Sequence, residues 1–102
     1  MIFAFQNALI ENLVYAARQL PKRATFSVAG IGRWQLPVTT AAITLGGHVR
    51  VGLEDNIYYA KGELAANHEF VARSHKIAEY LQRDVASPDE ARKILGLMPR
   101  LH

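Results

Sequence analysis

The sequence contains no cysteine. This absence excludes a disulfide-stapled fold, a thiolate metal site and a cysteine nucleophile, so any metal ligand must come from His, Asp or Glu. No apolar run approaches the roughly 20 residues that a membrane-spanning helix requires. The opening segment MIFAFQNALI has neither a basic stretch nor a small-residue cleavage site, so we do not expect a signal peptide.

Charge of one sign is also scarce. The chain has 12 Lys and Arg against 9 Asp and Glu, which gives a net charge of +3 and an isoelectric point near 9.5. The basic residues are scattered, so a nucleic-acid-binding module rests on the isoelectric point alone, and we expect neither nucleic acid nor a membrane as a partner. Half of the 102 residues are hydrophobic and 21% are charged, which is typical of one soluble domain and favours a cytoplasmic protein.

Apolar periodicity divides the chain into alternating helices and strands. Residues 1–102 are predicted to be a single segment made of a helix over 1–21, a βα unit over 24–47, a βα unit over 48–83 and a terminal helix over 87–96. This alternation predicts an α/β fold whose strands are parallel and joined by helices.

The strands themselves are predicted over 25–29 and 48–53. A helix is predicted over 34–45 because proline and glycine punctuate it, although its β-branched residues leave a strand as the competing interpretation. Residues 56–66 are predicted to form a loop.

Two later helices carry start signals. Asn67 is predicted to be the N-cap of a long amphipathic helix. Ser87, Pro88 and Glu90 supply a cap, a first-turn proline and a capping-box glutamate for the terminal helix.

Two predicted strands are too few to make a complete sheet, because parallel sheets are normally buried on both faces. The chain is therefore either a slice of a larger barrel or sheet, which we favour, or an obligate oligomer.

The second strand leads into the most informative charges. Val49 and Val51 fall on one apolar face, whereas Arg50 falls on the opposite face. Glu54 and Asp55 follow at the carboxyl end of the strand, where parallel α/β folds place their active sites. Arg50 lies about 13 Å back along an extended strand, a distance that its long side chain largely covers.

These three charged residues predict a site at the strand end. One carboxylate would hold a metal, and the other, oriented by Arg50, would transfer a proton. The alternative is a structural ion pair that only holds the end of the strand. Spacing alone does not decide between the two interpretations.

The run GGHVRVGLEDN over 46–56 resembles the signature of the β-keto acid cleavage enzymes, the family of 3-keto-5-aminohexanoate cleavage enzyme. AGIGR over 29–33, QLP over 35–37 and EARKIL over 90–95 resemble the family's C-terminal region in the same order. The resemblance covers most of residues 24–97. The long run is specific, whereas AGIGR alone would be weak.

This resemblance implies a fold and a reaction. The chain would be the C-terminal part of a TIM (β/α)8 barrel, consisting of the last two βα units with a preceding and a terminal helix. The enzymes of this family are zinc-dependent transferases. They convert a β-keto acid and acetyl-CoA into acetoacetate and a new acyl-CoA, which is a retro-Claisen-type cleavage of a carbon–carbon bond. The chain is then expected to form a homo-oligomer or to associate with the missing N-terminal part.

The resemblance also implies residue roles. Glu54 would bind zinc together with a His-x-His pair, Asp55 would be the base, and Arg50 would orient it. The sequence contains no His-x-His; its histidines are His48, His68, His75 and His102. We therefore expect activity only within a complete barrel, and the alternative is a catalytically inactive truncated α/β fragment that acts as an oligomerising structural module.

The segment Gly30-Ile31-Gly32-Arg33 joins a predicted strand to a predicted helix. Backbone amides at such a junction can bind an anion, so Gly30, Gly32 and Arg33 are candidates for contacts with coenzyme A or a substrate carboxylate. The equal alternative is a tight turn that needs positive φ. The segment lacks the third glycine of a dinucleotide fingerprint, so NAD binding is not expected.

Overall fold

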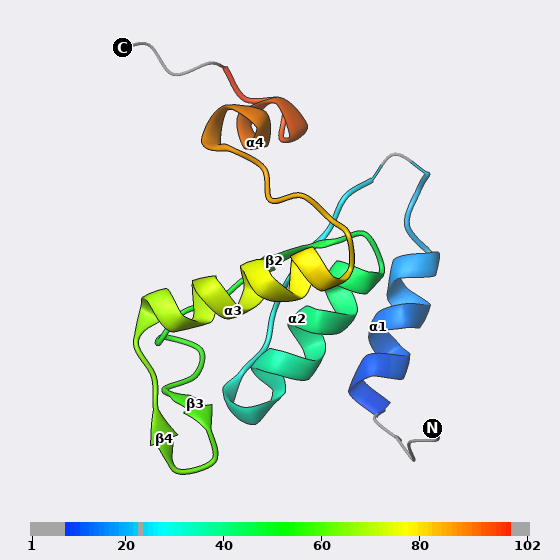
Figure 1. Ribbon diagram of the computed structural model, residues 1–102. Helices are drawn as coiled ribbons and strands as arrows, with labels where there is room; N and C mark the ends of the chain where they lie inside the picture. The colour runs from blue at the N-terminus through cyan, green and yellow to red at the C-terminus, as the bar shows by residue number, and fades with distance from the viewer. Residues whose placement is uncertain (1–7, 23, 99–102) are drawn as a thin grey trace.

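The computed structural model describes residues 8–22 and 24–98 (Figure 1). The elements in chain order are α1 (Ala8–Arg18), β1 (Ser27–Ala29), a 3-10 turn η1 (Gly32–Trp34), α2 (Gln35–Thr44), β2 (His48–Arg50), β3 (Tyr58–Ala60), β4 (Glu63–Leu64), α3 (Asn67–Tyr80) and α4 (Pro88–Ile94). The predicted α/β class is confirmed. None of the helices in the described part is long and apolar enough to cross a membrane. The first part of the helix predicted over 1–21 lies outside the described residues.

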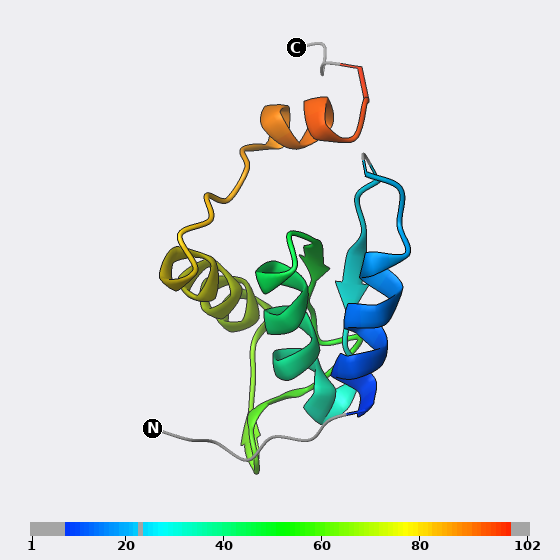
Figure 2. The same ribbon diagram turned by 90° about the vertical axis from the view of Figure 1, so that its right-hand side faces the viewer.

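β1 and β2 pair in parallel, as the alternation predicted. Ser27 is opposite His48 and Ala29 is opposite Arg50. Helix α2 connects the two strands and packs on both of them, while α1 and α3 pack on α2. Figure 2 shows α2 and α3 on the same side of the strand pair, with α4 beyond the end at which the strands begin. The carboxyl ends of both strands therefore lie at the end away from α4.

Helix α2 supplies most of the buried core. Val38, Ala42 and Ile43 are buried, together with the polar residues Gln35 and Thr39. The threonine hydroxyls of this helix donate to carbonyls three or four residues earlier, which accommodates β-branched residues within a helix. The helix interpretation of residues 34–45 is thus confirmed over its competitor.

Both predicted strands are shorter than expected. β1 covers 27–29 rather than 25–29, and β2 covers 48–50 rather than 48–53. β2 ends because a turn over Gly52–Asp55 follows it, closed by the Asp55 N–H donating to the Gly52 carbonyl at 3.2 Å. Extended backbone does not continue to the carboxylates, so the turn brings them back toward the strand.

The prediction of a plain loop over 56–66 is wrong. This stretch contains an antiparallel hairpin of β3 and β4. Asn56 fixes the start of the hairpin, because its Oδ1 accepts from the Tyr58 N–H at 3.0 Å and its Nδ2 donates to the Tyr58 carbonyl at 2.7 Å. Gly62 turns the chain with φ +76°, a conformation that favours glycine.

The two predicted helix starts have different outcomes. The prediction for Asn67 is wrong, because α3 begins at Asn67 and Ala66 occupies the N-cap position. The Ala66 N–H donates instead to Glu69 Oε1 at 2.7 Å. The start of α4 is confirmed: Ser87 Oγ accepts from the Glu90 N–H, and Glu90 Oε1 accepts from the Ser87 N–H, both at 3.2 Å.

Candidate functional site

The carboxyl end of β2 brings three charged side chains together. Arg50 Nη2 lies 3.4 Å from Asp55 Oδ1 and 3.5 Å from Glu54 Oε1. The side chains of Arg50 and Glu54 are 61% and 57% exposed, whereas that of Asp55 is 8% exposed. Arg50 was expected to meet one carboxylate at the strand end; it contacts both, because the turn, and not an extended strand, carries the carboxylates to it.

Asp55 is the buried member of this cluster. Its Oδ2 is buried and has no hydrogen-bond partner among the described residues. A buried polar atom without a partner costs free energy, so such an atom calls for an explanation in function or in a missing partner.

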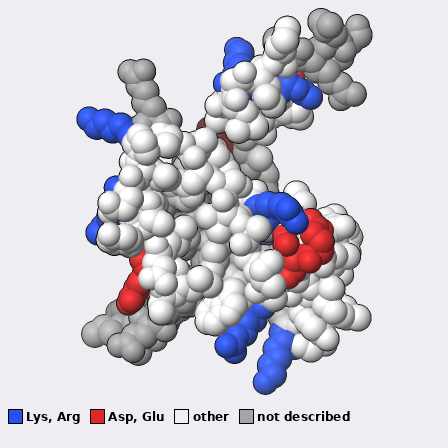
Figure 3. All heavy atoms as spheres, turned by 180° about the vertical axis from the view of Figure 1, so that it is seen from behind, with Lys and Arg blue, Asp and Glu red and all other residues white. Residues whose placement is uncertain are grey.

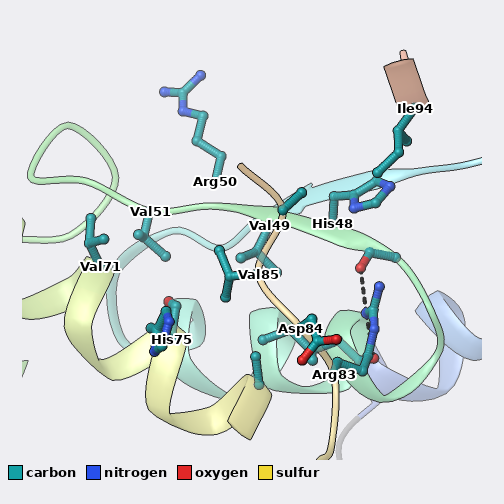
Figure 4. A pocket seen from close by; sticks show the side chains of 15 residues that line it. His48, Val49, Arg50, Val51, Val71, His75, Arg83, Asp84, Val85 and Ile94 are labelled. Carbon is teal, nitrogen blue, oxygen red and sulfur yellow. Dashed lines mark hydrogen bonds between the residues drawn. The ribbon is translucent and has the colours of Figure 1, made fainter. Parts of the chain in front are cut away.

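The two faces of β2 differ as the alternation predicted. Figure 4 shows Arg50 pointing away from the helices, whereas Val49 and Val51 point toward them. Figure 3 views the molecule from the side opposite to α2 and α3, where acidic side chains gather beside a basic one within a mostly uncharged surface. The polar face of β2 is therefore open on the side that carries neither α2 nor α3.

Side chains from two helices hold the Gly52–Asp55 turn. Asn67, at the start of α3, accepts a hydrogen bond from the Leu53 N–H through Oδ1 at 2.8 Å. Gln35, 1% exposed at the start of α2, donates from Nε2 to the Gly52 carbonyl at 3.4 Å. The sequence reasoning missed these two contacts because the residues are 14 and 17 positions apart. Two features of the sequence could have drawn attention to these residues. Gln35 is part of the QLP segment that resembles the family, and Asn67 is a residue type that caps helices.

The junction between β1 and α2 lies against the same turn. The Gly32 N–H donates to the Asp55 carbonyl at 2.8 Å, and Gly32 has φ +58°. A Cβ at Gly30 would overlap the backbone of Gln35. The guanidinium of Arg33 lies over the Trp34 ring at 4.8 Å. Gly32 has the positive φ that the tight-turn interpretation requires, whereas Gly30 is required by its close approach to the Gln35 backbone. Binding of coenzyme A or substrate at this junction stays a prediction.

Metal ligands do not gather in the described part of the chain. No group of three His, Asp or Glu side chains lies together there in a way that could hold a metal ion. Glu54 offers one exposed carboxylate, and His48 lies at the opposite end of β2. His102 lies outside the described residues. These residues alone do not make a zinc site, because structural and catalytic zinc sites take at least three protein ligands.

A groove of about 610 Å³ runs between β2 and α3. Its lining includes Val49 and Val51 from the strand segment, Val71 from α3, Val85 from the following link and Ile94 from α4 (Figure 4). Val71, Val85 and Ile94 are 59%, 56% and 54% exposed. Large apolar side chains that share one open groove are typical of a surface that packs against more protein.

The chain belongs to the beta-keto acid cleavage enzyme family, whose family model matches residues 2–97. This assignment agrees with the motif over 46–56 that contains Arg50, Glu54 and Asp55.

Three individual relatives show how much of an enzyme of this family the chain matches. The chain is 48% identical over 92 residues to a 3-keto-5-aminohexanoate cleavage enzyme from Fusobacterium nucleatum, which covers 89% of this chain and 34% of that enzyme. It is 44% identical, over the same shares of both chains, to the enzyme of the same name from Acetoanaerobium sticklandii. A 3-dehydrocarnitine:acetyl-CoA trimethylamine transferase from Rhizobium meliloti is 41% identical over 79% of this chain and 27% of its own length. The chain thus spans about a third of the length of these curated relatives.

Proposed function

We propose that this chain supplies part of the active site of an enzyme that cleaves a β-keto acid in the presence of acetyl-CoA, giving acetoacetate and a new acyl-CoA. The observation that carries the proposal is the Arg50–Asp55 contact at 3.4 Å, at the carboxyl end of a parallel strand. Family membership supports the reaction class. The names of the relatives support a β-keto acid and acetyl-CoA as the substrates.

Asp55 is the proposed base. Its carboxylate would accept the proton from the acidic carbon of the bound β-keto acid, the carbon that lies between the keto group and the substrate's own carboxylate. Arg50 would orient Asp55 by donating to Oδ1. The exposed guanidinium would also offset negative charge that develops on the substrate.

Glu54 is the proposed contribution of this chain to a zinc ion. Its exposed carboxylate would be one ligand, and the remaining ligands, a His-x-His pair, would come from outside the 102 residues. Zinc, when bound, would supply a Lewis acid for the keto oxygen. Gly30, Gly32 and Arg33, next to the same turn, would lie near an anionic part of coenzyme A or a substrate carboxylate.

The proposed setting is a TIM barrel of which this chain forms the last two βα units. Three observations support an incomplete sheet: β1 and β2 form a two-stranded pair in the described part, α2 and α3 lie on one side of it, and an apolar groove lies beside β2. Strands with unpaired edges and open apolar grooves favour association with more protein. The chain would therefore associate with the remaining barrel segments or form a homo-oligomer.

A chimeric enzyme tests the proposal. The chain replaces the matching 34% of the Fusobacterium nucleatum enzyme, and acetoacetate formation from 3-keto-5-aminohexanoate and acetyl-CoA is measured. Folding is checked by a cooperative thermal transition and by a single size-exclusion peak. A folded chimera that forms acetoacetate supports the proposal. A folded chimera that forms none favours the alternative of a structural module without catalysis.

A further inference from the structure

Asn67 is the first residue of α3 rather than its N-cap, although Asn is favoured at the N-cap position. Asn is among the best N-cap residues, and moving it one position earlier would cap α3 at a gain of about 1 kcal/mol. The position before it holds Ala66, which has no side-chain acceptor. The Asn67 oxygen instead accepts from the Leu53 N–H at 2.8 Å, outside the helix. Departures from local rules of this kind concentrate at functional sites.

The bonded amide lies within the turn that carries both carboxylates. Leu53 directly precedes Glu54 and Asp55, so fixing its N–H fixes the direction in which the chain leaves β2. Gln35 holds the preceding carbonyl, that of Gly52, from the other side. The two anchors come from different helices and act on adjacent residues of one short turn.

Gln35 is also joined to the far end of the turn. Asn56 Nδ2 lies 3.5 Å from Gln35 Oε1, so the one buried amide contacts groups before and after the carboxylates. Asn56 in turn holds the start of the hairpin through Tyr58. A buried amide with both its oxygen and its nitrogen engaged has little freedom to rotate, which makes Gln35 a rigid support.

We infer that Asn67 and Gln35 are positioning residues for the Arg50–Asp55 pair. They touch neither of these two side chains; they act through the Gly52–Asp55 turn, whose path sets where Asp55 stands relative to Arg50. This inference rests on the proposed function, in which Asp55 is the base. Removing groups that hold metal ligands in place typically lowers activity about 10- to 100-fold, and we expect a loss of similar size for groups that hold this turn.

Substitutions of Asn67 are easier to interpret than substitutions of Gln35. Asn67 is exposed, so replacing it leaves the buried core intact. In the chimera, Asn67→Leu removes the acceptor, whereas Asn67→Asp keeps an oxygen at the same place. We expect kcat to fall about 10- to 100-fold in Asn67→Leu and to stay within about threefold of the parent in Asn67→Asp. His68→Leu, on the neighbouring exposed residue, is the matched control and should not change kcat.

A second measurement is made on the 102-residue chain itself and does not depend on enzyme activity. Hydrogen exchange of the Leu53 amide, followed by NMR in the 102-residue chain, should be faster in Asn67→Leu and unchanged in Asn67→Asp. For Gln35, the variant Gln35→Met is compared with Thr39→Val, a substitution at another buried polar residue of α2. When the two variant chimeras have equal thermal stability, Gln35→Met should lower kcat more than Thr39→Val does.

The outcomes separate the two proposals. If Asp55→Asn leaves the chimera fully active, the proposed function is wrong. If Asp55→Asn inactivates the chimera but Asn67→Leu and Asn67→Asp have equal kcat, the positioning inference is overturned and the proposed function stands. Equal loss of activity in both Asn67 variants, with the Leu53 amide protected in each, also overturns the inference.

Discussion

Arg50 Nη2 and Asp55 Oδ1 are 3.4 Å apart, yet the Arg50 side chain is 61% exposed and the Asp55 side chain is 8% exposed. A cation that faces solvent thus holds a carboxylate that is almost fully enclosed. The Arg50–Glu54 pair, which is exposed on both sides, contributes little to folding, about 0–1 kcal/mol. The Arg50–Asp55 pair differs, because an enclosed carboxylate is costly when it has no charged partner. The guanidinium therefore both compensates the charge of the enclosed carboxylate and fixes where that carboxylate stands.

Arg50→Met tests whether Arg50 acts in turnover as well as in holding the end of the strand. We expect the chimera to lose acetoacetate formation, because Asp55 Oδ1 would lose its guanidinium partner. The free energy of unfolding should also fall, because Asp55, whose side chain is 8% exposed, would be left as an enclosed carboxylate without a charged partner. Turnover is therefore compared on chimeras that are shown to be folded at the assay temperature. Lys76→Met is the control, because Lys76 is 62% exposed and paired with Glu79 at 3.3 Å. A large loss of stability in Arg50→Met without a loss of turnover would favour the structural ion pair.

Glu54→Gln should lower the zinc content of the chimera, because the amide is a much weaker zinc ligand than a carboxylate. Gly52→Ala should act in the same direction, since a Cβ at Gly52 would overlap the Glu54 carboxylate and displace it. Zinc per chain is measured by mass spectrometry after dialysis. Glu79→Gln, at an acid of similar exposure, should retain the parent's zinc. Stoichiometric zinc in Glu54→Gln would contradict the assignment of Glu54 as a ligand.

The start of α4 should depend on pH. Hydrogen bonds from the Ser87 backbone N–H, and then from the Ser87 hydroxyl, hold the pKa of Glu90 below its ordinary value of 4.5. A carboxyl whose folded-state pKa is lowered contributes stability above its unfolded pKa and loses it as the pH falls through the folded pKa. The α4 carbon chemical shifts should therefore move toward coil values as the pH falls below about 4.5 in the parent.

The Glu90→Gln variant is the control for this titration. Its α4 shifts should not follow that acid transition, because the capping side chain no longer titrates. Ser87→Ala should weaken the helix start at every pH, since it removes the N-cap oxygen that accepts from the Glu90 N–H. Identical titration curves for the parent and Glu90→Gln would show that the capping box does not control α4.

Local sequence patterns predicted the parts of this molecule that depend on neighbouring residues. The capping box at Ser87 and Glu90 lies within four residues, and the alternation of Val49, Arg50 and Val51 needs only strand geometry. That Arg50 could meet a carboxylate at the strand end was also predicted, because a long side chain tolerates an error in the backbone path; that it contacts both carboxylates was not predicted. That path itself was not predicted: β2 ends early and a turn replaces the expected extension.

Contacts between distant residues were not predictable from such patterns. Asn67 looks like an N-cap because Asn favours that position, and only the fold places the Leu53 amide within its reach. The hairpin beginning at Tyr58 was hidden because its strands are two or three residues long, which is too short to show alternation. The apolar groove beside β2 likewise depends on where α3 packs.

The most direct measurement is the turnover of the chimera with Asp55→Asn against Asp89→Asn. Asp89 is paired with Arg92 at 3.1 Å, so this control removes an Arg–Asp pair that lies away from β2. General-base catalysis is worth about 10²–10⁴-fold, and we predict a loss of that size in kcat for Asp55→Asn with no loss for Asp89→Asn. Equal turnover in the two variants, with both folded, would contradict the assignment of Asp55 as the base.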